Sequence, residues 1–155
     1  MEWERLIRFV LLGASGLEQY AILLVRVLLG LFFAISGANK LFVAARRQAM
    51  YQTLAEAGVP SPHAMTYFVS GVEFLGGCLL IVGLLSSLAS LALLVDMLVA
   101  ILTARLSTMP KGVSPLNWLD DFLFLPEVLY VLFFIWLICS GPGKFSLDSW
   151  LASKL

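Results

Sequence analysis

The sequence predicts an all-α membrane protein, an antiparallel bundle of four transmembrane helices. Hydrophobic residues make up 61% of the 155-residue chain and charged residues only 13%, a composition far from that of soluble domains. Four apolar stretches are long enough, at about 1.5 Å of rise per residue, to cross a hydrocarbon core of about 30 Å. They cover residues 20–38, 65–85, 88–106 and 122–139. The remaining segments are short, so we expect one membrane domain over residues 1–155.

Short amphipathic helices are expected at the membrane surface in three places. In residues 2–12, apolar side chains share one helical face and charged side chains the other, which is typical of an interfacial helix. Residues 42–57 indicate a second helix, which Gly58 ends as a C-cap. Near the C-terminus, Ser146 suits the N-cap of a third.

The connections set the topology of the bundle. Ser86-Ser87 joins the second and third spans so closely that they must form a tight antiparallel hairpin. Four crossings then place both termini and this turn on one side of the membrane, called side A, and the two longer loops on side B. Lys and Arg are nearly balanced between the sides, so the positive-inside rule gives no orientation. The net charge is zero, with no basic run, so nucleic-acid binding has no support.

Ionisable residues inside the spans are the main functional signal. Arg26, Glu73, Asp96 and Glu127 all lie at membrane depth, where an ionised side chain costs on the order of several kcal/mol unless it is paired or hydrated. Such residues are functional candidates by default. Counting along the helices sorts them into two layers, one in each half of the membrane.

The layer near side B is the predicted small-molecule site. Glu73 and Glu127 each lie about 10 Å in from side B. Lys40 and Arg105 stand at the side B ends of their spans, within reach of the carboxylates. Converging polar groups under a loop, in an otherwise apolar bundle, describe a ligand pocket. The candidate catalytic residues are Glu73, Glu127 and Lys40, and the candidate binding residues are Arg105, Asn39 and Trp118.

The layer near side A holds Arg26 and Asp96, which we interpret as a structural ion pair. An alternative is that Arg26 extends its guanidinium toward the side A interface. The side B layer has a structural alternative too, because a buried ion pair can fix helix register without doing chemistry.

Small residues and cysteines complete the pattern. Gly30 and Gly37, with the glycines of the second span, predict close packing of the first two spans. Cys78 and Cys139 are expected at different depths and therefore unpaired. With His63 as the single histidine, neither a metal site nor a bis-histidine haem is predicted, and no covalent cofactor is expected.

The ordered motifs resemble those of the DoxX family of small bacterial membrane proteins. The first span carries Arg26 and then Gly-x-x-Phe-x-x-Ser-Gly-x-x-Lys-Leu over residues 30–41. The second has Glu-x-x-Gly-Gly-x-x-Leu-x-x-Gly over residues 73–83, and the tail reads Gly-Pro-Gly-x-x-Ser-Leu-Asp over residues 141–148. Two departures stand out: relatives often carry a basic residue where this chain has Ser86-Ser87, and some a histidine near Ala104-Arg105.

The resemblance implies a four-helix, multi-pass protein of the bacterial cytoplasmic membrane, linked to redox systems. One branch is the membrane subunit of a thiosulfate:quinone oxidoreductase, and another associates with thiol and superoxide-detoxifying enzymes. It therefore implies a component that binds a quinone or similar lipophilic molecule, with Lys40 and Arg105 polarising a carbonyl or binding an anion, and Glu73 or Glu127 carrying protons.

Electrons would come from a partner redox protein, because the sequence has no haem ligand set, flavin motif or CxxC pair. The expected contacts are therefore membrane lipid and a redox partner or further copies of the chain. The alternative is a non-enzymatic scaffold or accessory subunit whose buried charges are structural. A solute carrier is less favoured, because four spans without an inverted repeat fall short of transporter architecture.

Overall fold

The computed structural model describes residues 3, 7, 9, 10 and 16–155. Apart from those first four positions, the amphipathic helix expected over residues 2–12 lies outside the described residues. Within the described part of the chain all regular structure is helical, which agrees with the predicted class.

Three helices are long and apolar enough to cross a membrane. They are α2 (Glu18–Phe42), α4 (Pro62–Val82) and the continuous stretch Ser86–Thr108. That stretch comprises α5 (Ser86–Ala100), a π-helical turn η1 (Ile101–Arg105) and α6 (Leu106–Thr108). A π-helical turn inside a longer helix is often found at functional sites.

The last predicted span differs from the expectation of one helix over residues 122–139. The chain forms α7 (Pro115–Leu123) and α8 (Pro126–Ser140), which bend by 64° at the break and count as a further candidate span only if taken together. Pro126 explains the break, because the residue before a proline is pushed out of the helical region, and Leu125 has a ψ of 126°. The structure therefore has three candidate spans, or four with the bent pair.

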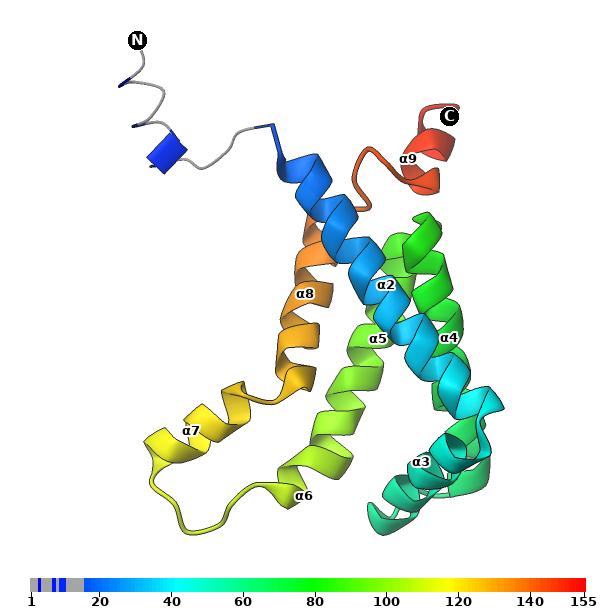
Figure 1. Cartoon of the computed structure of the whole chain (residues 1–155), viewed down its shortest axis with the longest axis vertical. Helices are drawn as coiled ribbons and strands as arrows, with labels where there is room; N and C mark the ends of the chain where they lie inside the picture. The colour runs from blue at the N-terminus through cyan, green and yellow to red at the C-terminus, as the bar shows by residue number, and fades with distance from the viewer. Residues whose placement is uncertain (1–2, 4–6, 8, 11–15) are drawn as a thin grey trace.

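The arrangement in space follows the predicted sidedness (Figure 1). The start of α2, the α4–α5 turn and the C-terminal helix α9 (Leu147–Ala152) lie at one end of the bundle, which is side A. The helix α3 (Ala44–Glu56), together with α6 and α7, lies at the opposite end, side B.

Two of the predicted short helices are present, in the first loop and at the C-terminus. α3 lies within the expected residues 42–57, and Gly58 follows it with a φ of 70°. The Ser146 hydroxyl caps α9 by accepting a hydrogen bond from the Ser149 amide at 3.1 Å.

The first two spans pack backbone to backbone, as the glycines predict. A Cβ at Gly30 would lie 2.8 Å from the Gly77 carbonyl oxygen, and one at Gly37 would lie 2.7 Å from the Ser70 carbonyl oxygen. Neither position has room for a larger side chain, so α2 and α4 form the tightest pair of the bundle. The apolar core beside them includes Phe33, Leu80, Leu93 and Phe134.

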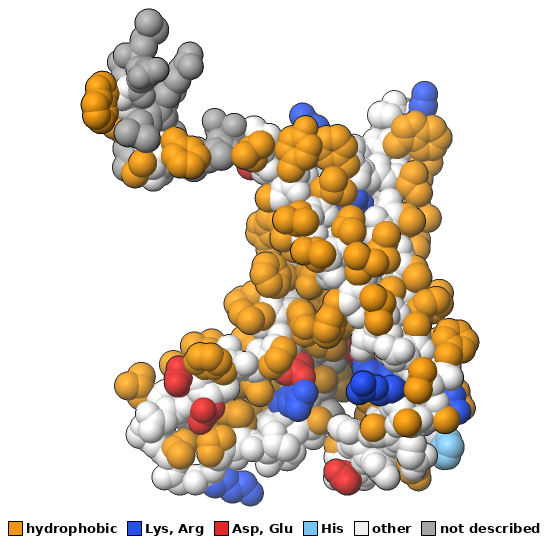
Figure 2. Space-filling view, viewed as in Figure 1, with side chains coloured by type: hydrophobic (Ala, Val, Ile, Leu, Met, Phe, Trp, Pro, Cys, Tyr) orange, Lys and Arg blue, Asp and Glu red, His pale blue; other side chains and the backbone are white. Residues whose placement is uncertain are grey.

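The outer surface of the bundle is apolar. Apolar side chains cover it between the two ends, and charged side chains gather toward the side B end (Figure 2). Leu75 and Leu132, for example, are 62% and 56% exposed. A surface of this kind contacts lipid in a membrane.

Candidate functional site

The first feature of the site is a buried ion pair between Lys40 and Glu73. The Lys40 Nζ lies 2.6 Å from Glu73 Oε1 and 2.7 Å from Oε2, so one ammonium binds both carboxylate oxygens. The Ser36 hydroxyl donates a third hydrogen bond to Oε2 at 3.3 Å. Glu73 is only 3% exposed. Both the inward orientation of Glu73 and its predicted pairing with a cation near side B are confirmed.

The local sequence explains why these groups meet. Ser36 and Lys40 are four residues apart and therefore lie on one face of α2. Gly37 stands between them, and a Cβ there would overlap the Phe74 amide of α4. This close approach of the two backbones brings the Lys40 side chain against Glu73.

Lys40 also lines a cavity beside the side B half of α2. The cavity has a volume of about 350 Å³ and is lined by Ser36, Asn39 and Lys40 together with Phe32, Ile35 and Arg46. The Lys40 side chain is 24% exposed, whereas that of Glu73 is 4% exposed. A ligand in the cavity therefore meets the Lys40 ammonium before the Glu73 carboxylate. Asn39, a predicted binding residue, lines the same cavity.

A second ion pair joins η1 to α8. Arg105 Nε lies 2.7 Å from Glu127 Oε1, while Oε2 is buried with no hydrogen-bond partner. The Arg105 side chain is 49% exposed and that of Glu127 is 11% exposed. Glu127 stands in the first turn of α8, where the helix dipole favours a negative charge.

The predicted site is thus divided between two helix pairs. The Lys40–Glu73 pair joins α2 to α4, and the Arg105–Glu127 pair joins η1 to α8. Neither Arg105 nor Glu127 lines the cavity beside Lys40. Trp118 does not line it either, and stacks instead on Phe122, with ring centroids 5.4 Å apart. The bend between α7 and α8 carries Trp118 away on a separate helix.

The predicted ion pair between Arg26 and Asp96 is wrong. Arg26 is 1% exposed, and its Nη2 donates a 2.6 Å hydrogen bond to the Phe145 carbonyl oxygen. Asp96 Oδ2 is buried with no hydrogen-bond partner, and the residue lines a groove between α4 and α5. Both helices begin two residues earlier than predicted, at Glu18 and Ser86, so depth does not separate Arg26 from Asp96. The two side chains instead lie on helix faces that do not meet, one toward the tail and the other along the α4–α5 groove.

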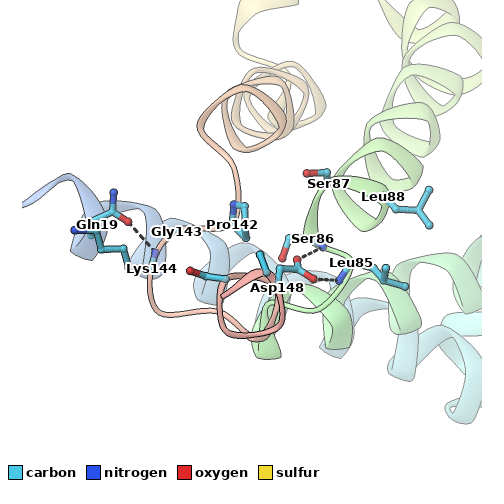
Figure 3. A pocket seen from close by; sticks show the side chains of 11 residues that line it. Gln19, Leu85, Ser86, Ser87, Leu88, Pro142, Gly143, Lys144 and Asp148 are labelled. Carbon is cyan, nitrogen blue, oxygen red and sulfur yellow. Dashed lines mark hydrogen bonds between the residues drawn. The ribbon is translucent and has the colours of Figure 1, made fainter. Parts of the chain in front are cut away.

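The partner that sequence reasoning missed is the C-terminal tail. Asp148 accepts hydrogen bonds from the Leu85 amide at 2.7 Å and the Ser86 amide at 2.8 Å, and so caps α5 (Figure 3). Its own amide donates to the Gly83 carbonyl oxygen at 2.8 Å. A Cβ at Gly83 would overlap the Arg26 guanidinium. Arg26 and Asp148 therefore hold the tail against the α4–α5 turn.

Side A accordingly carries a hollow at the tail, lined by both polar and apolar residues. It has a volume of about 600 Å³, between the α4–α5 turn, the tail and Gln19, whose side chain accepts a hydrogen bond from the Lys144 amide at 2.8 Å. Burial alone would raise the pKa of Asp148, but the hydrogen bonds from Ser86 and Leu85 and the charge of Arg26 outweigh it and hold the pKa below its ordinary value. The sequence signal was available in the Ser-Leu-Asp of the tail, since an acidic residue there can cap a neighbouring helix.

Metal ligands and thiols contribute little to the site. Across the described residues, no group of three or more His, Cys, Asp or Glu side chains is placed to hold a metal ion. Cys78 and Cys139 are both free thiols, the second of them exposed.

Two comparisons with known proteins relate this chain to membrane proteins. The sequence model of the DoxX family matches residues 21–106, which contain Arg26, Lys40, Glu73 and Asp96. The chain is also similar to the uncharacterized membrane protein Rv3486 of Mycobacterium tuberculosis, with 29% identity over 147 residues, covering 93% of this chain and 88% of that protein. No solved structure matches the chain. With the apolar helices, these findings identify a multi-pass bacterial membrane protein.

Proposed function

This chain belongs to the DoxX family of membrane proteins, and we propose that it is the integral membrane component of a redox system. In this role it binds a quinone or a similar small lipophilic molecule between its helices and works with a partner oxidoreductase. The partner supplies or accepts the electrons, because the sequence itself carries no haem ligand set, flavin motif or CxxC pair.

The observation that supports this proposal best is the Lys40–Glu73 pair beside its cavity. The carboxylate is 3% exposed and is held by one ammonium at 2.6 and 2.7 Å. The same ammonium lines an open cavity of about 350 Å³. A ligand oxygen in that cavity meets a cation that can polarise a carbonyl or bind an anion, backed by a carboxylate that can exchange a proton with it.

The Lys40–Glu73 pair also fixes the position of the ammonium. Lys40 is preorganised by Glu73, whose carboxylate also accepts a hydrogen bond from the Ser36 hydroxyl, so the ammonium is already in position when a ligand arrives. Exposed Arg46 and Asn39, which also line the cavity, add a further cation and an amide for an oxygen-bearing headgroup.

The test is ligand content and binding in the purified protein. We expect lipid extraction followed by mass spectrometry to find a quinone bound to the wild-type chain, and Glu73→Gln and Lys40→Met to abolish its retention while the protein stays folded in detergent. Arg26→Met serves as the matched buried-cation control: we expect it to lower thermal stability, because it releases the tail, and to keep the quinone.

A scaffold or accessory subunit is the second candidate, and one observation favours it. Each ion pair bridges a different pair of helices, which is what structural cross-links would do. If no quinone is ever detected, and if Glu73→Gln and Lys40→Met reduce only stability, the scaffold function is correct. Loss of quinone in Arg26→Met alone would place the site in the other half of the membrane.

A further inference from the structure

A third hollow lies on the lipid-facing surface, between α4 and α5. It has a volume of about 330 Å³ and is lined by apolar side chains of both helices, among them Phe68, Val72, Ala92 and Val95. Phe68 and Val95 are 64% and 51% exposed, so this groove opens toward the lipid. Among the described residues that line it, Asp96 alone has an ionisable side chain.

Asp96 is chemically out of place in such a groove. Its Oδ2 is buried and has no hydrogen-bond partner. The residue lies about 15 Å along the helix from Ser86, near the middle of the 23-residue apolar stretch. A buried oxygen without a partner costs about 1–3 kcal/mol, and lipid tails offer it no donor. An ionisable group with this placement is therefore a candidate to meet a polar group that arrives from the membrane.

The groove and the Lys40–Glu73 pair share helix α4. Glu73 follows Val72, a lining residue of the groove, directly in the chain. The ion pair therefore lies next to the groove wall along α4, and Lys40 lines the side B cavity.

We propose that the α4–α5 groove is the lateral entry subsite at which the lipophilic ligand first binds, with the Asp96 carboxyl group as its hydrogen-bond partner. This inference rests on the proposed function and names the place where the ligand leaves the lipid before it reaches Lys40. The volume of about 330 Å³ is in the usual range for small-molecule sites, which starts at about 300 Å³. The occupant is a flat molecule of the quinone class, bearing a carbonyl or hydroxyl on its ring.

The chemistry of the groove favours this occupant over the other apolar groups of a membrane. A phospholipid acyl chain fills apolar space but has no group that Asp96 can bind. A quinone ring offers a carbonyl and its reduced form a hydroxyl, either of which forms a hydrogen bond with a carboxyl group in its matching protonation state. The apolar walls then take the ring faces, and the open side lets a hydrocarbon tail remain in the lipid.

Photolabelling of the full chain in phosphatidylcholine nanodiscs tests this inference. The probe is a short-tailed benzoquinone with an azido group, and labelled peptides are mapped by mass spectrometry. We expect labelling on α4 and α5 along the groove. Ala92→Trp fills the groove and should lower labelling about tenfold or more, and Asp96→Leu should weaken binding about tenfold, as expected for one lost hydrogen bond.

The control is Ala21→Trp, which places the same bulky side chain on an exposed position of α2 outside the groove and should leave labelling unchanged. If Asp96→Leu does not fold, Asp96→Asn takes its place, and it should retain more binding than Ala92→Trp because it keeps a hydrogen-bonding group.

The possible results are distinct. Labelling confined to Ser36 and Asn39, and unaffected by Ala92→Trp, would support the proposed function and overturn the groove. Labelling of the groove that an alkylbenzene without ring oxygens competes away equally well would overturn the role of Asp96 and mark a lipid site. The absence of specific labelling anywhere would overturn both the groove and the quinone-binding function.

Discussion

Removing Lys40 should destabilise the protein more than neutralising Glu73, although both changes break the same ion pair. Lys40→Met leaves Glu73, which is 3% exposed, without its cation. Removing one partner of a buried pair costs about 3–5 kcal/mol, because the remaining charge is stranded. The Ser36 hydroxyl at 3.3 Å compensates only weakly.

Glu73→Gln removes the charge but keeps the shape and most of the hydrogen bonding of the side chain. The Lys40 ammonium then remains, and its side chain is already 24% exposed to a cavity on side B. It can turn toward water, so we expect a loss of about 1–2 kcal/mol, the range for one charged hydrogen bond offset by new hydration.

The double variant Lys40→Met/Glu73→Met separates the two contributions. With both charges gone, no group is stranded, and replacing a buried pair by apolar side chains is often close to neutral. We expect it to be more stable than Lys40→Met alone. The assay is reversible unfolding in mixed detergent micelles, followed by helical circular dichroism, for all four proteins at the same pH.

The opposite order of stabilities would contradict a stranded Glu73 carboxylate in Lys40→Met. If Glu73→Gln were as destabilising as Lys40→Met, the cavity would not be hydrating the free ammonium. If the double variant were the least stable of the set, the pair would contribute through its packing rather than its charges.

Two further predictions follow from the tail and the α2–α4 contact. Asp148→Asn replaces one of the two accepting oxygens by an NH2 group, so one backbone amide of the α4–α5 turn loses its partner, at a cost of about 1 kcal/mol. Because the folded-state pKa of Asp148 lies below its ordinary value of 3.8, the stabilisation is complete above that pH and is lost as the pH falls through the folded-state pKa. Acid titration of unfolding should therefore show a smaller loss in Asp148→Asn than in wild type, and identical profiles would contradict the cap. Gly37→Val should separate α2 from α4 and strongly destabilise the fold, whereas Gly71→Ala, where a Cβ meets nothing within 4 Å, should be nearly neutral in thermal denaturation.

Side-chain contacts across the bundle were predictable where depth and helical face both pointed to them. Lys40 ends one apolar stretch, and Glu73 lies in the same half of the membrane on the neighbouring glycine-bearing span, so few other partners were available to either. Arg105 and Glu127 pair for the same reason. The break at Pro126 was also predictable, because the residue before a proline is disfavoured in a helix. The predicted span nevertheless included Pro126, because it was defined by apolar composition alone.

The prediction paired Arg26 with Asp96 because it compared only their depths along straight helices. It did not include the C-terminal tail, which folds back over the side A end of the bundle. Arg26 is held by Phe145, which is 119 positions away in the chain, and sequence periodicity contains no information about such contacts. Asp96 lines the groove between α4 and α5, a placement set by the rotation of α5 rather than by depth.

The sequence by itself determined the membrane class, the first three spans, the contact of α2 with α4 and the inward orientation of Glu73. Each of these follows from apolarity, glycine spacing or the cost of a charge in lipid, and all three are local properties of the chain. Only the tertiary structure decided that the side B charges form two separate pairs, that the tail caps α5, and that Asp96 faces an apolar groove. Those features depend on how helices are rotated and tilted against one another, which is set by packing among residues distant in the sequence.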